Sequence, residues 1–256
     1  MYAVITGASK GIGKAIAIEL AKRHYNLVLV ARSADLLNQV KKEIQTNHPV
    51  AIETLGLDLS SHDAASKLLA FCESKHLKVS VLVNNAGYGL SGKIDKYSLD
   101  DNSNMVQLNV LTLTQITQVF LPILEKNSPS YLLNVASTAA YQAIPNLAIY
   151  SATKAFVLSF SRALHHELKP RNISVTCVSP GGTNTDFSHR AEISEKALKA
   201  GEKVNMSPED VAKIGVDALF TKKAEVVTGI LNKIGAFGAW LMPKFISEKI
   251  AGSIYE

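Results

Sequence analysis

Short apolar segments recur along the chain, and amphipathic segments of helix length lie between them. Seven apolar segments have strand length: residues 3–6, 27–31, 51–57, 79–83, 131–136, 173–178 and 224–229. The first, second and fourth are continuous apolar runs, a pattern typical of parallel strands that are buried on both faces. Residues 12–23 and 36–44 have helical spacing, and Leu37, Val40 and Ile44 fall on one stripe.

This alternation predicts an α/β protein with a doubly wound, Rossmann-type parallel sheet of about seven strands and helices on both faces. A chain of 256 residues can be organised by one core, so we expect a single domain over residues 1–256. The last third departs from the alternation, with a polar segment at about 186–207 and an apolar tail at about 230–256. The longest uncharged stretch of the tail, 234–243, is about half the ~20 residues of a membrane span, so no transmembrane segment is predicted.

Composition and charge exclude several classes of protein. With 47% hydrophobic and 19% charged residues, the chain is neither disordered nor fibrous. The 27 Lys and Arg residues exceed the 22 Asp and Glu residues, which gives a net charge of +5. No long basic run and no basic face with interleaved aromatic residues occurs, so we expect no nucleic-acid partner.

The two cysteines and the first residues of the chain bear on its compartment. Cys72 and Cys177 lie far apart without metal-ligand spacing, so we expect two reduced thiols and no metal site. The chain opens without the basic and apolar regions of an export signal. A cytoplasmic location is therefore expected.

A glycine-rich turn follows the first predicted strand and precedes the first predicted helix. Its glycines have the spacing G-x-x-x-G-x-G. Small residues let the backbone approach a phosphate, and the following helix N-terminus supplies N–H donors and positive potential. A dinucleotide pyrophosphate binds at this position in Rossmann-type sheets. The candidate cofactor-binding residues here are Gly7, Ser9, Lys10, Gly11, Ile12 and Gly13. A plain tight turn between a strand and a helix is the alternative.

The residue after the second predicted strand bears on the choice of dinucleotide. An acidic residue about 20 positions beyond the glycines would bind the ribose 2′-hydroxyl of NAD, but Arg32 stands there. A cation at this position would pair with a 2′-phosphate, and Lys10 could supply a second cation. We therefore expect NADP(H), with a solvated loop arginine as the alternative.

Tyr150 and Lys154 are four residues apart in a segment with helical spacing, so their side chains leave the same helix face. A phenol has a pKa of about 10, and an ammonium roughly 5 Å away favours its ionised form by about 3 kcal/mol at an effective dielectric constant of about 20. The tyrosine could then act as a general acid and base while the lysine stays charged. Ser137 directly follows the strand 131–136, where its hydroxyl could donate to a substrate oxygen. An ordinary helix-surface pair is the alternative for Tyr150 and Lys154.

Taken together, these motifs resemble the short-chain dehydrogenase/reductase family in its compact single-domain branch. The resemblance covers essentially the whole chain, and no catalytic position departs from the pattern. It rests on Thr6-Gly7-x-x-x-Gly11-x-Gly13, Asp58-Leu59, Asn84-Asn85-Ala86-Gly87, Asn109, Ser137, Tyr150-x-x-x-Lys154 and Pro180-Gly181-x-x-x-Thr185. It implies an NADPH-dependent oxidoreductase that transfers a hydride between the nicotinamide and a carbonyl or secondary alcohol.

The resemblance also implies a role for each residue. Tyr150 would donate a proton to the carbonyl oxygen, Lys154 would also hold the nicotinamide ribose, and Ser137 would position the carbonyl. Asn109, inside a predicted helix over 99–125, would support a proton relay through Lys154. Besides Tyr150 and Lys154, the remaining cofactor contacts would come from Asp58 and Leu59 near the adenine, from Asn85, Ala86 and Gly87, and from Pro180, Gly181, Thr183 and Thr185 over the nicotinamide.

The polar segment 186–207 is the expected substrate loop, and the apolar tail 230–256 fits a cover over the substrate cleft or a subunit contact. We expect a small-molecule carbonyl substrate, either a hydrophobic ketone or one of 3-oxoacyl type. A noncatalytic NADPH-binding sensor or scaffold is the alternative, which the presence of both Tyr150 and Lys154 disfavours.

Two further expectations concern partners. The helices at 99–125 and 149–168 expose apolar faces that, in the family, meet symmetry mates, so a homodimer or homotetramer is expected. The segment 230–250, with Lys233, Lys244 and Lys249 in or beside its apolar residues, could contact a membrane surface, although we do not favour this reading from the sequence.

Overall fold

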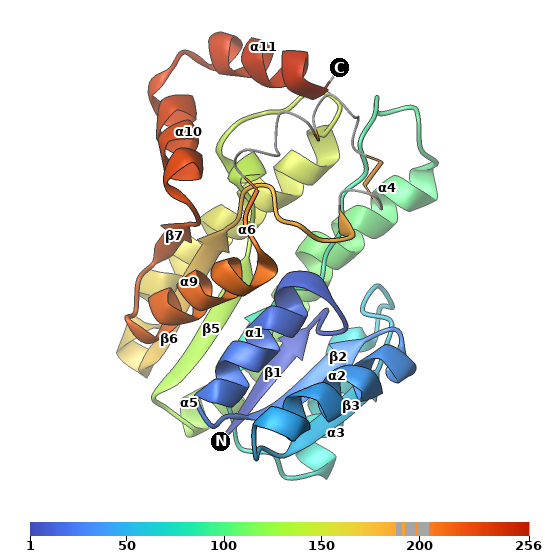
Figure 1. Ribbon diagram of the computed structural model, residues 1–256, viewed down its shortest axis with the longest axis vertical. Coiled ribbons are helices and arrows are strands. Elements are labelled where there is room, and N and C mark those ends of the chain that lie inside the picture. Colours follow the sequence, from blue (N-terminus) through green and yellow to red (C-terminus); the bar gives the residue numbers. More distant parts are fainter. Residues whose placement is uncertain (188–190, 193–197, 199–204, 256) are drawn as a thin grey trace.

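A seven-stranded parallel sheet forms the centre of the computed structural model, which describes residues 1–187, 191–192, 198 and 205–255 (Figure 1). The strands are β1 (Tyr2–Thr6), β2 (Asn26–Ala31), β3 (Ile52–Gly56), β4 (Val79–Asn84), β5 (Ser130–Val135), β6 (Ile173–Ser179) and β7 (Glu225–Val227). Their order in the sheet is β3-β2-β1-β4-β5-β6-β7. The predicted doubly wound sheet is therefore confirmed, although β7 has three residues where six were expected.

Two layers of helices cover the sheet because successive side chains of a buried strand point to opposite faces. In β1, Ala3 and Ile5 pack into one core and Val4 packs into the other. The first layer contains α1 (Gly11–Lys22), α2 (Ala34–Asn47) and α9 (Pro208–Phe220). The second contains α3 (Ala64–Ser74), α5 (Leu113–Lys126) and α6 (Ala148–Glu167). Both faces of the sheet are thus buried, as its continuous apolar strands require.

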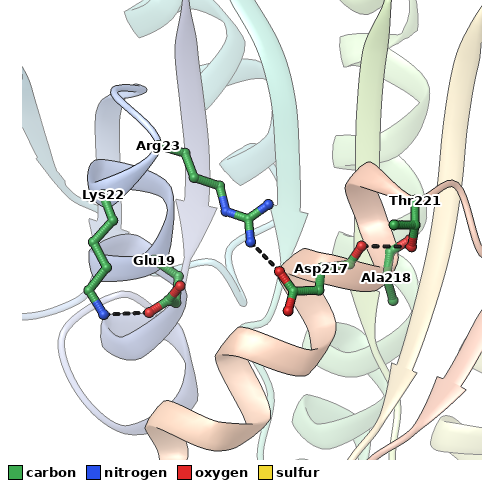
Figure 2. A network of polar contacts seen from close by, with 6 residues as sticks. All are labelled: Glu19, Lys22, Arg23, Asp217, Ala218 and Thr221. Atoms are coloured by element: carbon green, nitrogen blue, oxygen red, sulfur yellow. Dashed lines mark hydrogen bonds and ion pairs between the residues drawn. The ribbon is translucent and has the colours of Figure 1, made fainter.

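Helices α1 and α9 are far apart in the sequence but pack against each other. Leu20 of α1 and Val216 of α9 are buried in the same core. At the end of α1, Arg23 forms an ion pair with Asp217, whose backbone carbonyl accepts a hydrogen bond from the Thr221 hydroxyl (Figure 2). The ion pair is partly exposed, so apolar packing contributes most to holding the two helices together.

The helix predicted over 99–125 contains a wide turn. It begins as α4 (Leu99–Val106), becomes π-helical over η1 (Gln107–Thr112) and continues as α5. A capping box of Ser98 and Asp101 fixes its start. The π turn carries Asn109, and such turns are frequent at functional sites.

The same stretch, Leu99–Lys126, is the one segment of the described chain with the length and mean hydropathy, 1.2, of a membrane-spanning helix. Its residues Ile116 and Phe120 are buried in the core with α3. A core helix meets the same criteria of length and composition.

Two further helices follow β7 at the end of the molecule away from the N-terminus (Figure 1). They are α10 (Ile230–Leu241) and α11 (Lys244–Tyr255). Gly229 makes the turn into α10 with a φ of +83°, a conformation that suits glycine. Helix α10 packs against the short 3₁₀ helix η2 (Thr138–Tyr141), and Ala251 of α11 is buried in a cluster with Ile144.

Both cysteines are free thiols inside the protein. Cys72 lies in α3 and Cys177 in β6, and each is fully buried. Burial raises the pKa of the Cys72 thiol to about 12 and that of the Cys177 thiol to about 11.

Candidate active site

A cavity of about 770 Å³ lies beyond the carboxyl ends of the central strands. The chain leaves β1 and β4 towards opposite sides of the sheet, and α/β proteins bind ligands at such a switch point. The cavity wall includes every predicted cofactor-binding residue: Gly7, Ser9, Lys10, Gly11, Ile12, Gly13, Arg32, Asp58, Leu59, Asn85, Ala86, Gly87, Tyr150, Lys154, Pro180, Gly181, Thr183 and Thr185. It also includes Ser137, whereas Asn109 lies outside the wall.

The glycine turn is compact because its backbone needs glycines. Gly7 and Gly11 have φ values of +66° and +56°, in the left-handed region. A Cβ on Gly13 would stand 2.3 Å from the Gly7 carbonyl oxygen. Helix α1 then begins at Gly11, and no side chain caps the first N–H groups, which have no partner within a helix. The turn therefore has the geometry to hold an anion at one side of the cavity, and we call it the anion cradle.

Thr6, at the end of β1, links this strand by hydrogen bonds to the end of β4 and the residues that follow it. Its hydroxyl donates to the Val83 carbonyl over 3.1 Å and accepts from the backbone N–H groups of Asn85, at 2.9 Å, and Ala86, at 3.0 Å. The Asn85 side-chain amide donates to the carbonyls of Thr6 and Gly7. The sequence motif contains Thr6, but its role as this tie could not be predicted because it depends on the register of β1 against β4.

Arg32 and Asp58 line the end of the cavity near β2 and β3. The Asp58 carboxylate accepts hydrogen bonds from the backbone N–H of Ser60, at 3.0 Å, and from its hydroxyl, at 2.8 Å. These bonds, and to a lesser extent the charge of Arg32, hold the pKa of Asp58 below its usual value. Arg32 is exposed, while Lys10 forms a 2.7 Å ion pair with Asp186.

Tyr150 and Lys154 lie on α6 four residues apart, as predicted, and both are buried. The Lys154 Nζ lies 5.8 Å from the centroid of the Tyr150 ring and donates to the Val135 carbonyl over 2.9 Å. Burial lowers the pKa of Lys154 to about 8. The ammonium is therefore mostly charged at neutral pH and lies near the phenol.

Asn109 is fixed behind this pair by three hydrogen bonds. Its Oδ1 accepts from the Tyr88 backbone N–H at 3.1 Å, and its Nδ2 donates to the Tyr88 carbonyl at 2.8 Å and to the Thr153 hydroxyl at 3.1 Å. A Cβ on Gly87 would stand 2.9 Å from the Asn109 Oδ1 and 3.6 Å from the Lys154 Nζ. Gly87 thus separates the asparagine from the lysine. Tyr88 and Thr153 were not anticipated, since only the folded chain brings them to Asn109.

Ser137 is held by the turn that follows β5. Its hydroxyl oxygen accepts a 3.1 Å hydrogen bond from the Ala139 N–H and caps η2. A hydroxyl that accepts in this way keeps its own proton to donate. Ser137 can therefore present a donor to the cavity.

Apolar residues form the rest of the cavity wall. Phe187 packs against the Tyr150 ring with centroids 5.4 Å apart. Helices α10 and α11 close the far side with side chains that sequence reasoning did not assign to the site, including Leu231, Ala236 and Ala251. The small or apolar residues on one face of each helix were the sequence signal that could have assigned these side chains to the cavity. The expected substrate loop, 186–207, contributes Asp186, Phe187, Leu198 and Asn205, and most of its other residues lie outside the described part of the chain.

Three comparisons place this architecture among known proteins. Residues 1–196 match the family model of the short chain dehydrogenases. The very-long-chain 3-oxoacyl-CoA reductase of Mus musculus is 40% identical over 185 residues, which are 70% of this chain and 58% of that protein. A short-chain dehydrogenase from Sphingobium yanoikuyae, solved in complex with NADPH, has a TM-score of 0.82 at 27% identity and covers 92% of this chain and 91% of its own. The 3-ketoacyl-(acyl-carrier-protein) reductase of Brucella melitensis, complexed with NADH, has a TM-score of 0.78 at 28% identity and covers 89% and 96%.

The strand order, with a glycine cradle at its switch point, defines a Rossmann-type α/β protein. The family match covers more than half of the residues and agrees with the motifs at the cavity. The chain belongs to the short-chain dehydrogenase family. It spans 58% of the length of the Mus musculus and Bos taurus relatives that it matches.

Proposed function

We propose that this protein is an NADPH-dependent carbonyl reductase whose substrate is a hydrophobic ketone of the 3-oxoacyl type. One observation carries the proposal. A single cavity joins the anion cradle, the buried Tyr150 and Lys154 pair, Ser137 and an apolar wall. Such a cavity suits a dinucleotide beside a carbonyl compound with an apolar chain.

The cavity fits a phosphorylated dinucleotide. The turn from Gly7 to Gly13 would hold the pyrophosphate at the start of α1, and the exposed Arg32 would pair with a 2′-phosphate. Bound NADPH would supply the hydride for the carbonyl carbon. Solved relatives include complexes with NADPH and with NADH, so the preference for NADPH rests on Arg32.

The protein's own residues would supply a proton and orient the carbonyl. Tyr150 would donate its phenolic proton to the carbonyl oxygen, because the Lys154 charge favours the phenolate that this leaves. Ser137 would donate a hydrogen bond to the same oxygen. Asn109 would hold the backbone beside Gly87 and Lys154 in place, and its part in a proton relay remains a prediction.

Two observations support a 3-oxoacyl substrate. The names of the Mus musculus and Brucella melitensis relatives specify 3-oxoacyl and 3-ketoacyl compounds. In this chain, Phe187, Leu231 and Ala236 give the cavity an apolar wall that would favour an acyl chain.

The test is NADPH oxidation with 3-oxoacyl-CoA substrates of increasing chain length and with short polar ketones. We expect kcat/KM to rise with chain length and to fall at least about a hundredfold in Tyr150→Phe, since general acid catalysis is worth that much. Tyr131→Phe, which removes the hydroxyl of a β5 tyrosine that lies outside the cavity wall, is the matched control. Faster turnover of short polar ketones, or full activity of Tyr150→Phe, would contradict the proposal.

A homodimer or homotetramer and a cytoplasmic location also remain predictions. Leu111 of η1 and Phe156 of α6 are exposed apolar residues on the two expected contact helices, and such an oligomer would cover them. The molecular mass in solution of wild type and of Phe156→Glu would test the oligomer.

A further inference from the structure

The outer surfaces of α10 and α11 form an exposed apolar region, which we call the C-terminal face. It consists of Ile230, Leu231, Ile234, Phe237, Trp240, Leu241, Met242, Phe245, Ile246 and Ile250. These are ten of the seventeen large hydrophobic residues that are exposed in the described part of the chain. Single exposed hydrophobic residues are ordinary, but a concentration of this kind marks a binding surface.

Helix α10 is apolar on both sides, and its two sides differ in size. Ile230, Ile234, Phe237 and Leu241 follow the helical repeat along the outer side, and their side chains are 61–76% exposed. On the inner side, Ala236 and other small residues line the cavity. The cavity explains the inner side, but it gives no reason for large hydrophobic residues on the outer one.

The C-terminal face also carries positive charge. Lys233, Lys244 and Lys249 are exposed on the same two helices, and Glu248 is the only acidic residue between positions 230 and 255. Trp240 is 73% exposed and packs against Phe237 with ring centroids 5.8 Å apart. Aromatic rings, aliphatic side chains and flanking lysines together are the composition of helices that lie in a membrane interface.

We infer that the C-terminal face docks the protein on the surface of an anionic lipid bilayer, with α10 and α11 lying in the interface. The cores of protein interfaces are depleted in lysine, so a second copy of this chain is a poorer match for a face with three exposed lysines. A bilayer suits them, because a lysine can bury its alkyl stem while its ammonium reaches the headgroups.

The position of this face bears on how substrate reaches the site. Leu231 belongs to both surfaces, since it lines the cavity and is 59% exposed. Figure 1 shows α10 along one side of the upper end of the molecule and α11 across its top, so the two helices are neighbours at that end. An apolar substrate dissolved in the bilayer would then enter at the rim near Leu231 without crossing water. This entry step rests on the proposed function, whereas the docking does not.

The experiment is flotation of the purified full chain with phosphatidylcholine vesicles and with vesicles that also contain phosphatidylglycerol. We expect binding to the anionic vesicles that weakens as salt is added, because salt screens the lysines. The variant Phe237→Ser/Trp240→Ser/Phe245→Ser should lose at least about tenfold in vesicle affinity, since it removes three exposed side chains that would be buried in the bilayer. Lys233→Gln/Lys244→Gln/Lys249→Gln should lose the preference for anionic vesicles.

The matched control is Ile94→Ser/Leu99→Ser, which removes two hydrophobic side chains that are 64% and 82% exposed elsewhere on the molecule. It should bind vesicles like wild type. Phe237, Trp240 and Phe245 lie outside the cavity wall, so the serine variant should still reduce a water-soluble ketone. This assay separates a failure of docking from a failure of the proposed reductase activity.

Three results would overturn the inference. Wild type could stay unbound with both kinds of vesicle, or the serine variant could float as well as wild type. Alternatively, wild type could form a dimer that the serine substitutions dissociate while no vesicle binding occurs, which would assign the face to a second copy of the chain. Sedimentation of the same variants without lipid distinguishes this last outcome.

Discussion

Lys154 shows how one residue can serve chemistry at the expense of stability. Its ammonium is buried and donates to the Val135 carbonyl, but its burial lowers its pKa from 10.5 to about 8. This difference corresponds to about 3 kcal/mol against the charged form. The charged form is also the one that would favour a Tyr150 phenolate. The proposed function therefore requires the form of Lys154 that burial destabilises.

The pKa of Lys154 predicts a pH dependence of stability. Between pH 8 and pH 10.5 the folded protein has released this proton while the unfolded chain still binds it, so stability rises with pH in this window. We expect the free energy of unfolding of wild type, relative to Lys154→Met, to increase by about 3 kcal/mol across the window. Urea denaturation of both proteins at several pH values measures this. An unchanged difference between them would contradict the lowered pKa.

Arg32 predicts the cofactor preference. Arg32→Asp removes the cation that would pair with a 2′-phosphate and supplies a carboxylate that could accept from the 2′-hydroxyl of NADH. We expect the ratio of kcat/KM for NADPH to that for NADH to fall by at least about a hundredfold, or about 3 kcal/mol. Lys42→Asp, on the exposed side of α2, makes the same change of charge outside the cavity wall and should leave the ratio near that of wild type. An unaltered ratio in Arg32→Asp would reject the assignment of NADPH.

At the scale of elements, the π turn η1 and the segment after β4 form one unit. Asn109 bonds both the N–H and the carbonyl of Tyr88, and it bonds Thr153 on α6. Three elements therefore meet at one amide side chain. The close approach of Gly87 to Asn109 and Lys154 leaves no room for a side chain there.

Gly87→Ala tests this unit. The added methyl would stand 2.9 Å from the Asn109 Oδ1, and the three hydrogen bonds of Asn109 prevent an easy shift. We expect the free energy of unfolding to fall by about 1–3 kcal/mol and kcat to fall at least about tenfold. The circular dichroism spectrum should match that of wild type. In the control Gly238→Ala, the methyl would meet only the Met242 Cε, at 3.9 Å, and the substitution should leave stability unchanged or raise it. Equal stability and equal kcat in the two variants would contradict the close approach of Gly87 to Asn109.

The elements that local pattern determines were predictable from the sequence. The continuous apolar strands gave the parallel sheet, and the four-residue spacing of Tyr150 and Lys154 placed both on one face of α6. Apart from Tyr150 and Lys154 on α6, the predicted cofactor residues share one cavity because each follows the carboxyl end of a strand or begins the next helix.

Features that depend on distant parts of the chain were not predictable. The π turn was not predicted because local periodicity does not distinguish it from an α-helix, and the contact of Asn109 with Tyr88 forms only in the folded chain. The seventh strand was predicted over 224–229 but is only three residues long, and the division of the tail into α10 and α11 was not predicted, because the tail is apolar on both sides of each helix. The hydrogen bonds of Thr6 depend on the register of β1 against β4, two strands that are distant in sequence.

At the scale of the whole molecule, the first and last parts of the chain support each other. Helix α1, which carries the glycine cradle, packs against α9, and α9 connects β6 to β7 before α10 reaches the cavity. The cradle therefore depends on packing between the first and last parts of the chain, and the apolar wall depends on the separate cluster that contains Ala251 and Ile144. Unfolding of either end should open the cavity.

The two buried thiols provide a natural reporter of such opening events. Cys72 lies among the helices of the second layer and Cys177 lies inside β6, so a thiol reagent reaches each only when its own surroundings separate. We expect both to resist a disulfide reagent in the native protein and to react together if the molecule opens cooperatively, with Cys72→Ala and Cys177→Ala assigning each phase. Markedly different rates would instead show that the surroundings of α3 and those of α5 and α6, which lie on the same side of the sheet, open independently. The protein thus carries its own pair of labels for mapping partial unfolding, without any engineered probe.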